Sequence, residues 1–208
     1  MARQPAIEFW YEFASTYSYL AAMRIEAEAA RAGVLVRWRP FLLGPIFAAQ
    51  GWTSSPFNLY PAKGRNMWRD VEREAARLGL PPLTKPDPFP QNSLSATRAA
   101  ILGQGEDWLV PFTKAIYEAS FAQARSIAEP AAVIAVLDSL GLDGTQTVKA
   151  ASAEANKTRL RVAGEEARSR GIYGAPSFLT EDGELFWGND RLEHALAWAV
   201  GERPGGLR

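Results

Sequence analysis

The stretch AIEFWYEFASTYSYLAAMRIE, residues 6–26, decides the fold of this chain. Its first part alternates apolar and acidic side chains and is rich in aromatic residues, so residues 6–13 are predicted to form a β-strand. Residues 17–31 are strong helix formers that end before Gly33, and a second strand is expected at residues 34–39. The chain therefore begins as a β-α-β unit.

The carboxyl-terminal part has the pattern of a hairpin followed by a helix. Strand-like residues 177–180 and 184–187 flank Glu181-Asp182-Gly183, whose Asp-Gly pair is a strong hairpin signal. A helix is expected at residues 191–200, capped by Asn189 or Asp190. This end of the chain therefore supplies two more strands.

A long, mostly helical segment separates these ends. Residues 44–63 have a loop-like composition, a helix follows with apolar positions Met67, Trp68, Val71, Ala75 and Leu78, and prolines exclude regular structure at residues 81–90. Further helices are expected at about residues 92–103, 107–123, 130–140, 144–152 and 154–170. Neither β-containing end is large enough to fold alone. The pattern predicts an α/β, thioredoxin-like fold in which residues 1–43 and 171–208 form one discontinuous domain and residues 44–170 an inserted all-helical domain.

The chain contains no cysteine and a single histidine, His194. Disulfide scaffolds, thiol nucleophiles, iron–sulfur clusters and multi-histidine metal sites are therefore excluded, and no metal is expected. Lys+Arg and Asp+Glu number 23 each, so no overall charge favours nucleic acid or a membrane surface. No stretch reaches the about 18 apolar residues of a membrane helix, and no signal peptide precedes the first strand, so a cytoplasmic protein is expected.

Three local patterns could carry chemistry. Ser15 lies at the strand-to-helix junction, where free N–H groups stabilise an anion such as a thiolate, although local sequence alone favours a plain helix cap, because serine and threonine are common caps. A cis Ala175–Pro176 bond would turn the Ala175 backbone outward to pair with an extended peptide, whereas a trans proline would only start an edge strand. Asn189 and Asp190 could grip an α-amino and α-carboxylate head group, or merely cap the last helix.

These three patterns together also match a known family. Residues 9–26, FWYEFASTYSYLAAMRIE, resemble the amino-terminal motif of 2-hydroxychromene-2-carboxylate isomerases and kappa-class glutathione transferases. Residues 171–192, GIYGAPSFLTEDGELFWGNDRL, resemble their carboxyl-terminal motif, and the likeness also runs through RWRPFLLGPIF and PAKG. The resemblance implies a thioredoxin domain interrupted by a helical domain, a homodimer, and the use of glutathione.

The resemblance also implies roles for single residues. Ser15 would stabilise or activate the glutathione thiolate. Ala175, before a cis Pro176, would pair with the tripeptide through its backbone, and Asn189 and Asp190 would hold its γ-glutamyl end.

The chain departs from the family pattern at two places. Thr16 follows Ser15 where the family usually has proline, which weakens the motif without removing a reacting group. The asparagine that the family carries after a glycine-rich turn is matched most nearly by Asn58. Thr16, Tyr17 and Asn58 are thus further expected contacts of glutathione. Disulfide oxidoreductases of the DsbA type carry Cys-x-x-Cys where this chain has residues 15–18, Ser-Thr-Tyr-Ser, so any reactive sulfur must come from a ligand.

The leading hypothesis is a glutathione-dependent isomerase resembling 2-hydroxychromene-2-carboxylate isomerase. The thiolate held by Ser15 would add to an electrophilic carbon of an aromatic-catabolism-type intermediate, and elimination would return it. Two alternatives stay open. One is a kappa-like glutathione transferase that conjugates small electrophiles, and the other is a non-catalytic thioredoxin-fold module that binds peptides beside Pro176.

Three further features allow two interpretations each. Four arginines at helical spacing, interleaved with acids, favour a solvated face over a phosphate-binding stripe: Arg65, Arg69, Arg73 and Arg77. His194 is expected on the surface rather than in a site. An aromatic-rich loop forms either core or dimer packing, or a lid over an apolar second substrate; it comprises Phe47, Trp52, Phe57 and Tyr60.

Overall fold

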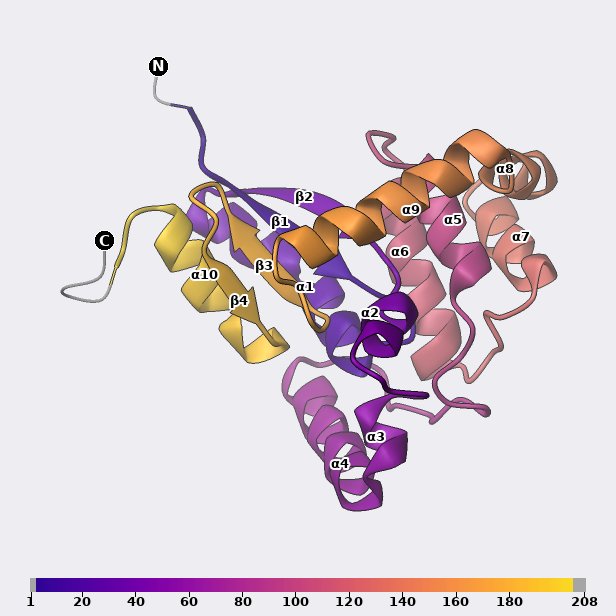
Figure 1. The fold of residues 1–208 in the computed structure, drawn as a ribbon, viewed down its shortest axis with the longest axis horizontal. Coiled ribbons are helices and arrows are strands. Elements are labelled where there is room, and N and C mark those ends of the chain that lie inside the picture. Colours follow the sequence, from indigo (N-terminus) through magenta and orange to yellow (C-terminus); the bar gives the residue numbers. More distant parts are fainter. Residues whose placement is uncertain (1–2, 204–208) are drawn as a thin grey trace.

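The computed structural model describes residues 3–203 and contains one four-stranded sheet in the order β2-β1-β3-β4 (Figure 1). The strands are β1 (Ala6–Tyr11), β2 (Leu35–Pro40), β3 (Ser177–Thr180) and β4 (Leu185–Trp187). β1 pairs in parallel with β2 and antiparallel with β3, and β3 pairs antiparallel with β4. The two ends of the chain thus meet in the middle of one sheet, where Phe9 lies opposite Phe178.

Helices cover both faces of this sheet. α1 (Thr16–Ala32) connects β1 to β2, begins at the cap Ser15 and ends at Gly33, whose φ of 68° is the left-handed conformation that glycine adopts without strain. α10 (Leu192–Ala199) packs on the same face behind the short 3₁₀ helix η2 (Asn189–Arg191). On the other face, α9 (Glu154–Ser169) and α2 (Gly44–Ala49) cover Trp10 of β1.

The inserted segment between β2 and β3 is more helical at its start than expected. It runs through α2, α3 (Pro56–Leu59), α4 (Pro61–Arg77), α5 (Leu94–Leu102), α6 (Leu109–Tyr117), the π-helical turn η1 (Glu118–Ala122), α7 (Pro130–Ser139), α8 (Gly144–Ala151) and α9. The prediction of a loop over residues 44–63 is therefore wrong for most of that range. The reason is that Pro45, Pro56 and Pro61 stand in first helical turns, where a missing N–H costs nothing.

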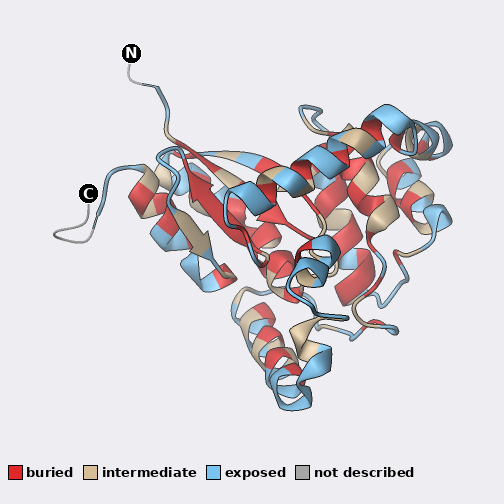
Figure 2. Cartoon of the chain, in the orientation of Figure 1, coloured by how far each residue is buried: buried red, intermediate tan, exposed pale blue. Residues whose placement is uncertain are grey.

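A continuous aromatic core joins the sheet to the inserted helices. Phe9 stacks on Tyr11 and on Phe178 within the sheet, and Phe13 contacts Phe112 and Tyr117 of α6. Figure 2 shows the buried residues running from the strands into the facing sides of these helices. The division into two domains stays a prediction, because the described core runs without a break from one part to the other.

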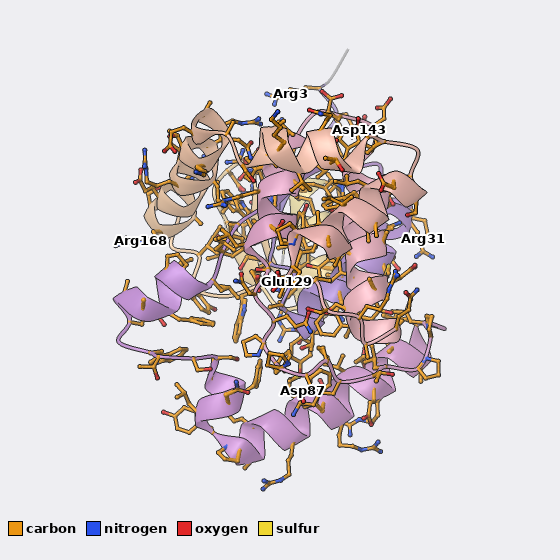
Figure 3. The ribbon with its side chains drawn as sticks, turned by 90° about the vertical axis from the view of Figure 1, so that its right-hand side faces the viewer. Arg3, Arg31, Asp87, Glu129, Asp143 and Arg168 are labelled. Carbon is orange, nitrogen blue, oxygen red and sulfur yellow. The ribbon has the colours of Figure 1, made fainter. Side chains whose placement is uncertain are left out.

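The α3 and α4 helices extend away from the sheet, with α4 at the lower edge of the molecule (Figures 1 and 3), whereas α2 packs against Trp10 of β1. The proline-rich connector that carries Asp87 returns along α4, where the ring centroids of Phe89 and Trp68 lie 4.9 Å apart. None of the described helices is both long and apolar enough to span a bilayer.

Candidate active site

A cavity of about 1800 Å³ opens between the sheet, α2, α4 and η2. Its walls come from residues 12–17, from the α2 to α3 segment, from α4, from residues 89–94, and from residues 173–176 and 185–194. The structure brings seven of the predicted site residues onto these walls: Ser15, Thr16, Tyr17, Ala175, Pro176, Asn189 and Asp190. Segments more than 150 residues apart in the chain therefore form a single site.

Ser15 is both the cap of α1 and a member of the cavity wall. Its Oγ accepts a hydrogen bond from the backbone N–H of Ser18 at 3.2 Å, and its hydroxyl donates to the carbonyl oxygen of Ala175 at 2.9 Å. The N–H groups of Thr16 and Tyr17 lie in the first helical turn, where no carbonyl of the helix can reach them. This arrangement offers an anion two backbone donors, a hydroxyl group and the positive end of a helix.

The Ala175–Pro176 peptide bond is cis, as predicted. The carbonyl of Ala175 points to Ser15, and since a carbonyl oxygen has two lone pairs, it can accept a second hydrogen bond from a ligand. Gly174 packs against the indole of Trp187 so closely that a Cβ there would lie 2.4 Å from its Nε1. A side chain at position 174 would thus displace Trp187, which also lines the cavity.

Asn189 and Asp190 lie on the cavity wall in different environments. Asn189 is buried, and its Oδ1 accepts from the Nε of Arg24 in α1 at 3.0 Å. Asp190 is exposed and pairs with its neighbour Arg191 at 3.1 Å. Asn189 thus also anchors η2 to α1, while the carboxylate of Asp190 is free to meet a ligand from solvent.

The side chains of Thr16 and Tyr17 are occupied by contacts with α4. The Thr16 hydroxyl is buried and donates to the sulfur of Met67 at 3.2 Å, and the Tyr17 hydroxyl donates to Asp70 at 2.9 Å. Burial and the neighbouring Asp70 raise the pKa of Tyr17 above its ordinary value, so its phenol stays protonated. These side chains hold α4 beside the start of α1, which leaves their backbone N–H groups as the groups that face an anion.

Asn58 is the predicted site residue that the cavity wall does not include. It is exposed, and its side-chain N–H group donates to the carbonyl of Phe89 at 2.9 Å. Its position in α3 ties that helix to the proline-rich connector.

The charges on the cavity wall are unevenly distributed. Apart from Glu12, they lie on α4, η2 and α10: Lys63, Asp70, Glu74, Arg77, Asp190, Arg191 and His194. The remaining wall, residues 42–57 and 89–94, carries no charged residue in its sequence, and we call it the uncharged wall.

Phe47, Trp52 and Phe57 belong to the uncharged wall, whereas Tyr60 is exposed outside the cavity. The interpretation of the aromatic loop as the cover of an apolar pocket is therefore favoured for three of its four residues. His194 is exposed, as expected, but it also lies on the cavity wall, so the structure does not separate the surface interpretation from the site interpretation. The arginine stripe of α4 is the expected solvated face, since Arg69, Arg73 and Arg77 pair with acids three residues away.

Glu12 is a cavity residue that the sequence reasoning missed. Alternation assigns it to the polar side of the predicted strand at residues 6–13, but in the structure it follows the end of β1 and is buried at 6% exposure, next to Ala14 and Ser15 on the cavity wall. A signal was present in the sequence, because a glutamate between Tyr11 and Phe13 lies in an otherwise apolar run. Among the described residues, no group of three metal-ligating side chains occurs.

The arrangement of sheet, inserted helices and cis-proline loop can be compared with known proteins. The family model described as DSBA-like thioredoxin domain matches residues 6–197. The chain belongs to the DSBA-like thioredoxin family. Residues 15–18, where disulfide oxidoreductases of the DsbA type carry Cys-x-x-Cys, have serine at both ends in this chain. The chain therefore has no thiol of its own at this position.

Two relatives of this chain carry the names of enzymes. The 2-hydroxychromene-2-carboxylate isomerase of Sphingobium xenophagum is 30% identical over 188 residues, covering 90% of this chain and 94% of that relative. Glutathione S-transferase kappa 1 of Caenorhabditis elegans is 26% identical over 213 residues, covering 95% and 91%. A solved 2-hydroxychromene-2-carboxylate isomerase superposes with a TM-score of 0.81 at 25% identity over 94% of each chain. The resemblance drawn from the two sequence motifs is confirmed, as is the thioredoxin-like fold with its helical insertion.

Proposed function

We propose that this protein is a glutathione-dependent enzyme that isomerises a small electrophilic compound of the kind met in aromatic catabolism. The observation that carries the proposal is the position of Ser15, at the amino end of α1, on the cavity wall and 2.9 Å from the Ala175 carbonyl. The 30% identity to an isomerase over 90% of the chain supports it, and so does the kappa transferase relative, whose name states the use of glutathione.

The residues of the cavity wall fit glutathione. Its backbone is an extended peptide, which the Ala175 carbonyl can pair with beside Pro176. Its charged ends meet Asp190 and the cations of α4 and η2. When bound, glutathione supplies a thiolate that adds to an electrophilic carbon and is later eliminated.

The chain's own residues would act on that sulfur in two ways. If the Ser15 hydroxyl turns from the Ala175 carbonyl to the ligand, it and the N–H groups of Thr16 and Tyr17 would donate hydrogen bonds to a negative charge at the start of α1. The partial positive charge of the helix end adds to this and lowers the pKa of a thiol. From the resemblance we also propose a cytoplasmic location and a homodimer. The use of reduced glutathione fits the first of these, because the cytoplasm keeps thiols reduced.

Replacing Ser15 tests the proposal. Ser15→Ala removes a hydroxyl donor to the thiolate, and a hydrogen bond to a charged group contributes about 1.5–3 kcal/mol. We therefore expect kcat/KM to fall by about 10- to 100-fold and the ultraviolet absorbance of bound thiolate to diminish, while glutathione still binds. Unchanged kinetics would remove Ser15 from the proposed role.

Asp143→Ala is the matched control, because Asp143 also caps a helix, accepting from the N–H of Gln146 at 2.8 Å in α8, which does not line the cavity. Loss of a cap costs about 1 kcal/mol in either variant. Asp143→Ala should lose this stability and keep its turnover, so a fall in turnover in both variants would trace to stability alone.

A kappa-like glutathione transferase is the second candidate, and the uncharged wall favours it. A carboxylate held there would find no cation within residues 42–57 or 89–94, and an unpaired buried carboxylate is costly. A neutral electrophile fits this wall without that penalty.

Incubation with glutathione and candidate electrophiles separates the two reactions, because a transferase consumes glutathione and an isomerase returns it. A peptide-binding module without catalysis would instead show calorimetric binding of extended peptides and none of glutathione.

A further inference from the structure

Glu12 is a buried acid that the proposed role of Ser15 does not use. Its Oε2 accepts a hydrogen bond from the N–H of Ala14 at 2.9 Å, and its Oε1 accepts one from the hydroxyl of Ser93. Its carbonyl accepts from the N–H of Ser15 at 3.0 Å. The two residues are therefore linked by one tight turn, and both line the cavity.

The other acids of the cavity wall are paired with cations. Asp70 pairs with Arg73 at 3.0 Å, Glu74 with Arg77 at 2.7 Å and Asp190 with Arg191 at 3.1 Å. Glu12 has no ion pair within residues 3–203, although buried glutamates are rarely left without one. An unpaired buried carboxylate gains from taking up a proton.

The surroundings of Glu12 place its titration near neutral pH. Burial raises its pKa to about 7, and the hydrogen bonds from Ser93 and Ala14 only partly oppose this. Tyr11 and Tyr117 are buried beside Glu12. Burial raises the pKa of both phenols, so both stay neutral. The other charged or titratable side chains of the cavity wall form no hydrogen bond or ion pair with the Glu12 carboxylate, whose partners are Ala14 and Ser93: Lys63, Asp70, Glu74, Arg77, Asp190, Arg191 and His194.

We propose that Glu12 accepts the thiol proton of glutathione as the thiolate forms beside Ser15, and returns that proton when the thiol is regenerated. The inference rests on the proposed function. In the forward step the S–H bond breaks, its electron pair stays on sulfur, and the proton forms an O–H bond on the Glu12 carboxylate. The reverse step restores both groups.

Electrostatics favour this step, because one negative charge moves from the Glu12 carboxylate to the sulfur and no second charge is created. Before the step the carboxylate is charged and the thiol neutral, and after it the sulfur is charged and Glu12 neutral. The pocket never holds two adjacent anions, because a thiolate raises the pKa of a neighbouring carboxyl group further. Ser15 cannot take the proton in the same way, since its hydroxyl already carries one and donates it to Ala175.

Counting the protons that reach the buffer on glutathione binding tests the proposal. Calorimetry in buffers of different ionisation enthalpy gives protons released, and ultraviolet absorbance gives thiolate formed. At about pH 8, above the pKa of Glu12, the wild-type protein should release about zero protons per thiolate, because the proton moves to Glu12. At about pH 6, where Glu12 is already protonated, it should release about one.

Glu12→Gln should release about one proton per thiolate at both pH values. Glu129→Gln, which changes an exposed glutamate outside the cavity, should keep the wild-type pattern. Release of about one proton at pH 8 by the wild-type protein would overturn the role of Glu12. Glutathione that fails to bind, or that binds without thiolate absorbance, would instead overturn the proposed function.

Ser93→Ala keeps the inference testable should Glu12→Gln fold poorly. Because the Ser93 hydrogen bond lowers the pKa of Glu12, its loss should shift the pH at which proton release disappears to a higher value. A midpoint unchanged from the wild-type protein would count against Glu12 as the acceptor.

Discussion

Ser15 illustrates how one residue can satisfy two interpretations at once. A helix cap and a thiolate-binding hydroxyl need the same position, because both use the unpaired N–H groups at the start of a helix. In this structure Ser15 accepts from Ser18 and donates to Ala175, so it joins α1 to the cis-proline loop 160 residues away. The cap is thus also what assembles the site.

Glu12 also leads to a prediction about stability. Its pKa is about 7 when folded and 4.5 as the reference value, so the folded protein binds more protons than the unfolded chain between these values. The stability contributed is fully present below about pH 4.5 and is lost as the pH rises through about 7. Over this range the loss amounts to as much as about 3 kcal/mol.

Glu12→Gln should remove this dependence, since glutamine does not titrate. As the pH rises from about 5 to about 8, the free energy of unfolding of the variant should increase relative to that of the wild-type protein, as measured by chemical denaturation at each pH. Parallel curves for the two proteins would show that Glu12 ionises alike in the folded and unfolded states.

At the scale of elements, η2 is held in place by α1. Arg24 is buried in α1 and donates to the side chain and the carbonyl of Asn189, and it pairs with Glu193 of α10. Burial works to raise the pKa of Glu193, but the hydrogen bond from Arg24, a backbone hydrogen bond and the charges of Arg24 and Arg77 together outweigh it, so the pKa lies below its ordinary value. The arginine thus fixes the loop that carries Asp190.

Replacing Arg24 by methionine keeps most of the apolar stem and removes these bonds. An unpaired buried acceptor costs about 1–3 kcal/mol, so the free energy of unfolding should fall by about that amount. The KM for glutathione should rise through displacement of Asp190, while the pKa of the bound thiol stays the same because Ser15 is untouched. Denaturation and thiolate titration measure the two effects.

Arg31→Met provides the comparison on the same helix. Arg31 lies at the periphery in Figure 3, its side chain is 70% exposed, and it pairs only with Glu28. Such exposed pairs contribute about 0–1 kcal/mol. Equal losses in the two variants would mean that Arg24 does not organise η2.

At the scale of the whole molecule, the cavity joins a charged side to an uncharged wall. The charges come from α4, η2 and α10, and the uncharged wall from the start of the inserted segment and from residues 89–94. The inserted segment therefore contributes both the uncharged wall and the charges of α4, while η2 and α10 contribute the remaining charges apart from Glu12. The second substrate would contact the insertion.

This division predicts a preference among electrophiles. Paired compounds that differ only in a free carboxylate or its methyl ester should be turned over unequally, with kcat/KM higher for the ester by about 10-fold or more, because the uncharged wall offers no cation. Gln50→Lys, on this wall, should narrow the difference. A carboxylate preferred by the wild-type protein would favour the isomerase relative's type of substrate instead.

The sequence alone determined the order of elements, since the β-α-β start, the Asp-Gly hairpin and most helix limits follow from local periodicity and turn chemistry. It also determined that any reactive sulfur must come with a ligand, because the chain contains no cysteine. Local patterns misjudged residues 44–63, where proline starts helices as readily as it stops them.

Only the tertiary structure decided which polar residues share an environment. Burial of Glu12, the engagement of Asn189 by Arg24 and the exclusion of Asn58 from the cavity wall all depend on contacts between distant segments. The electrostatic character of a side chain is set by what surrounds it in space, and strand alternation reports only which way it points. Position along the chain therefore identified Ser15, and packing identified Glu12.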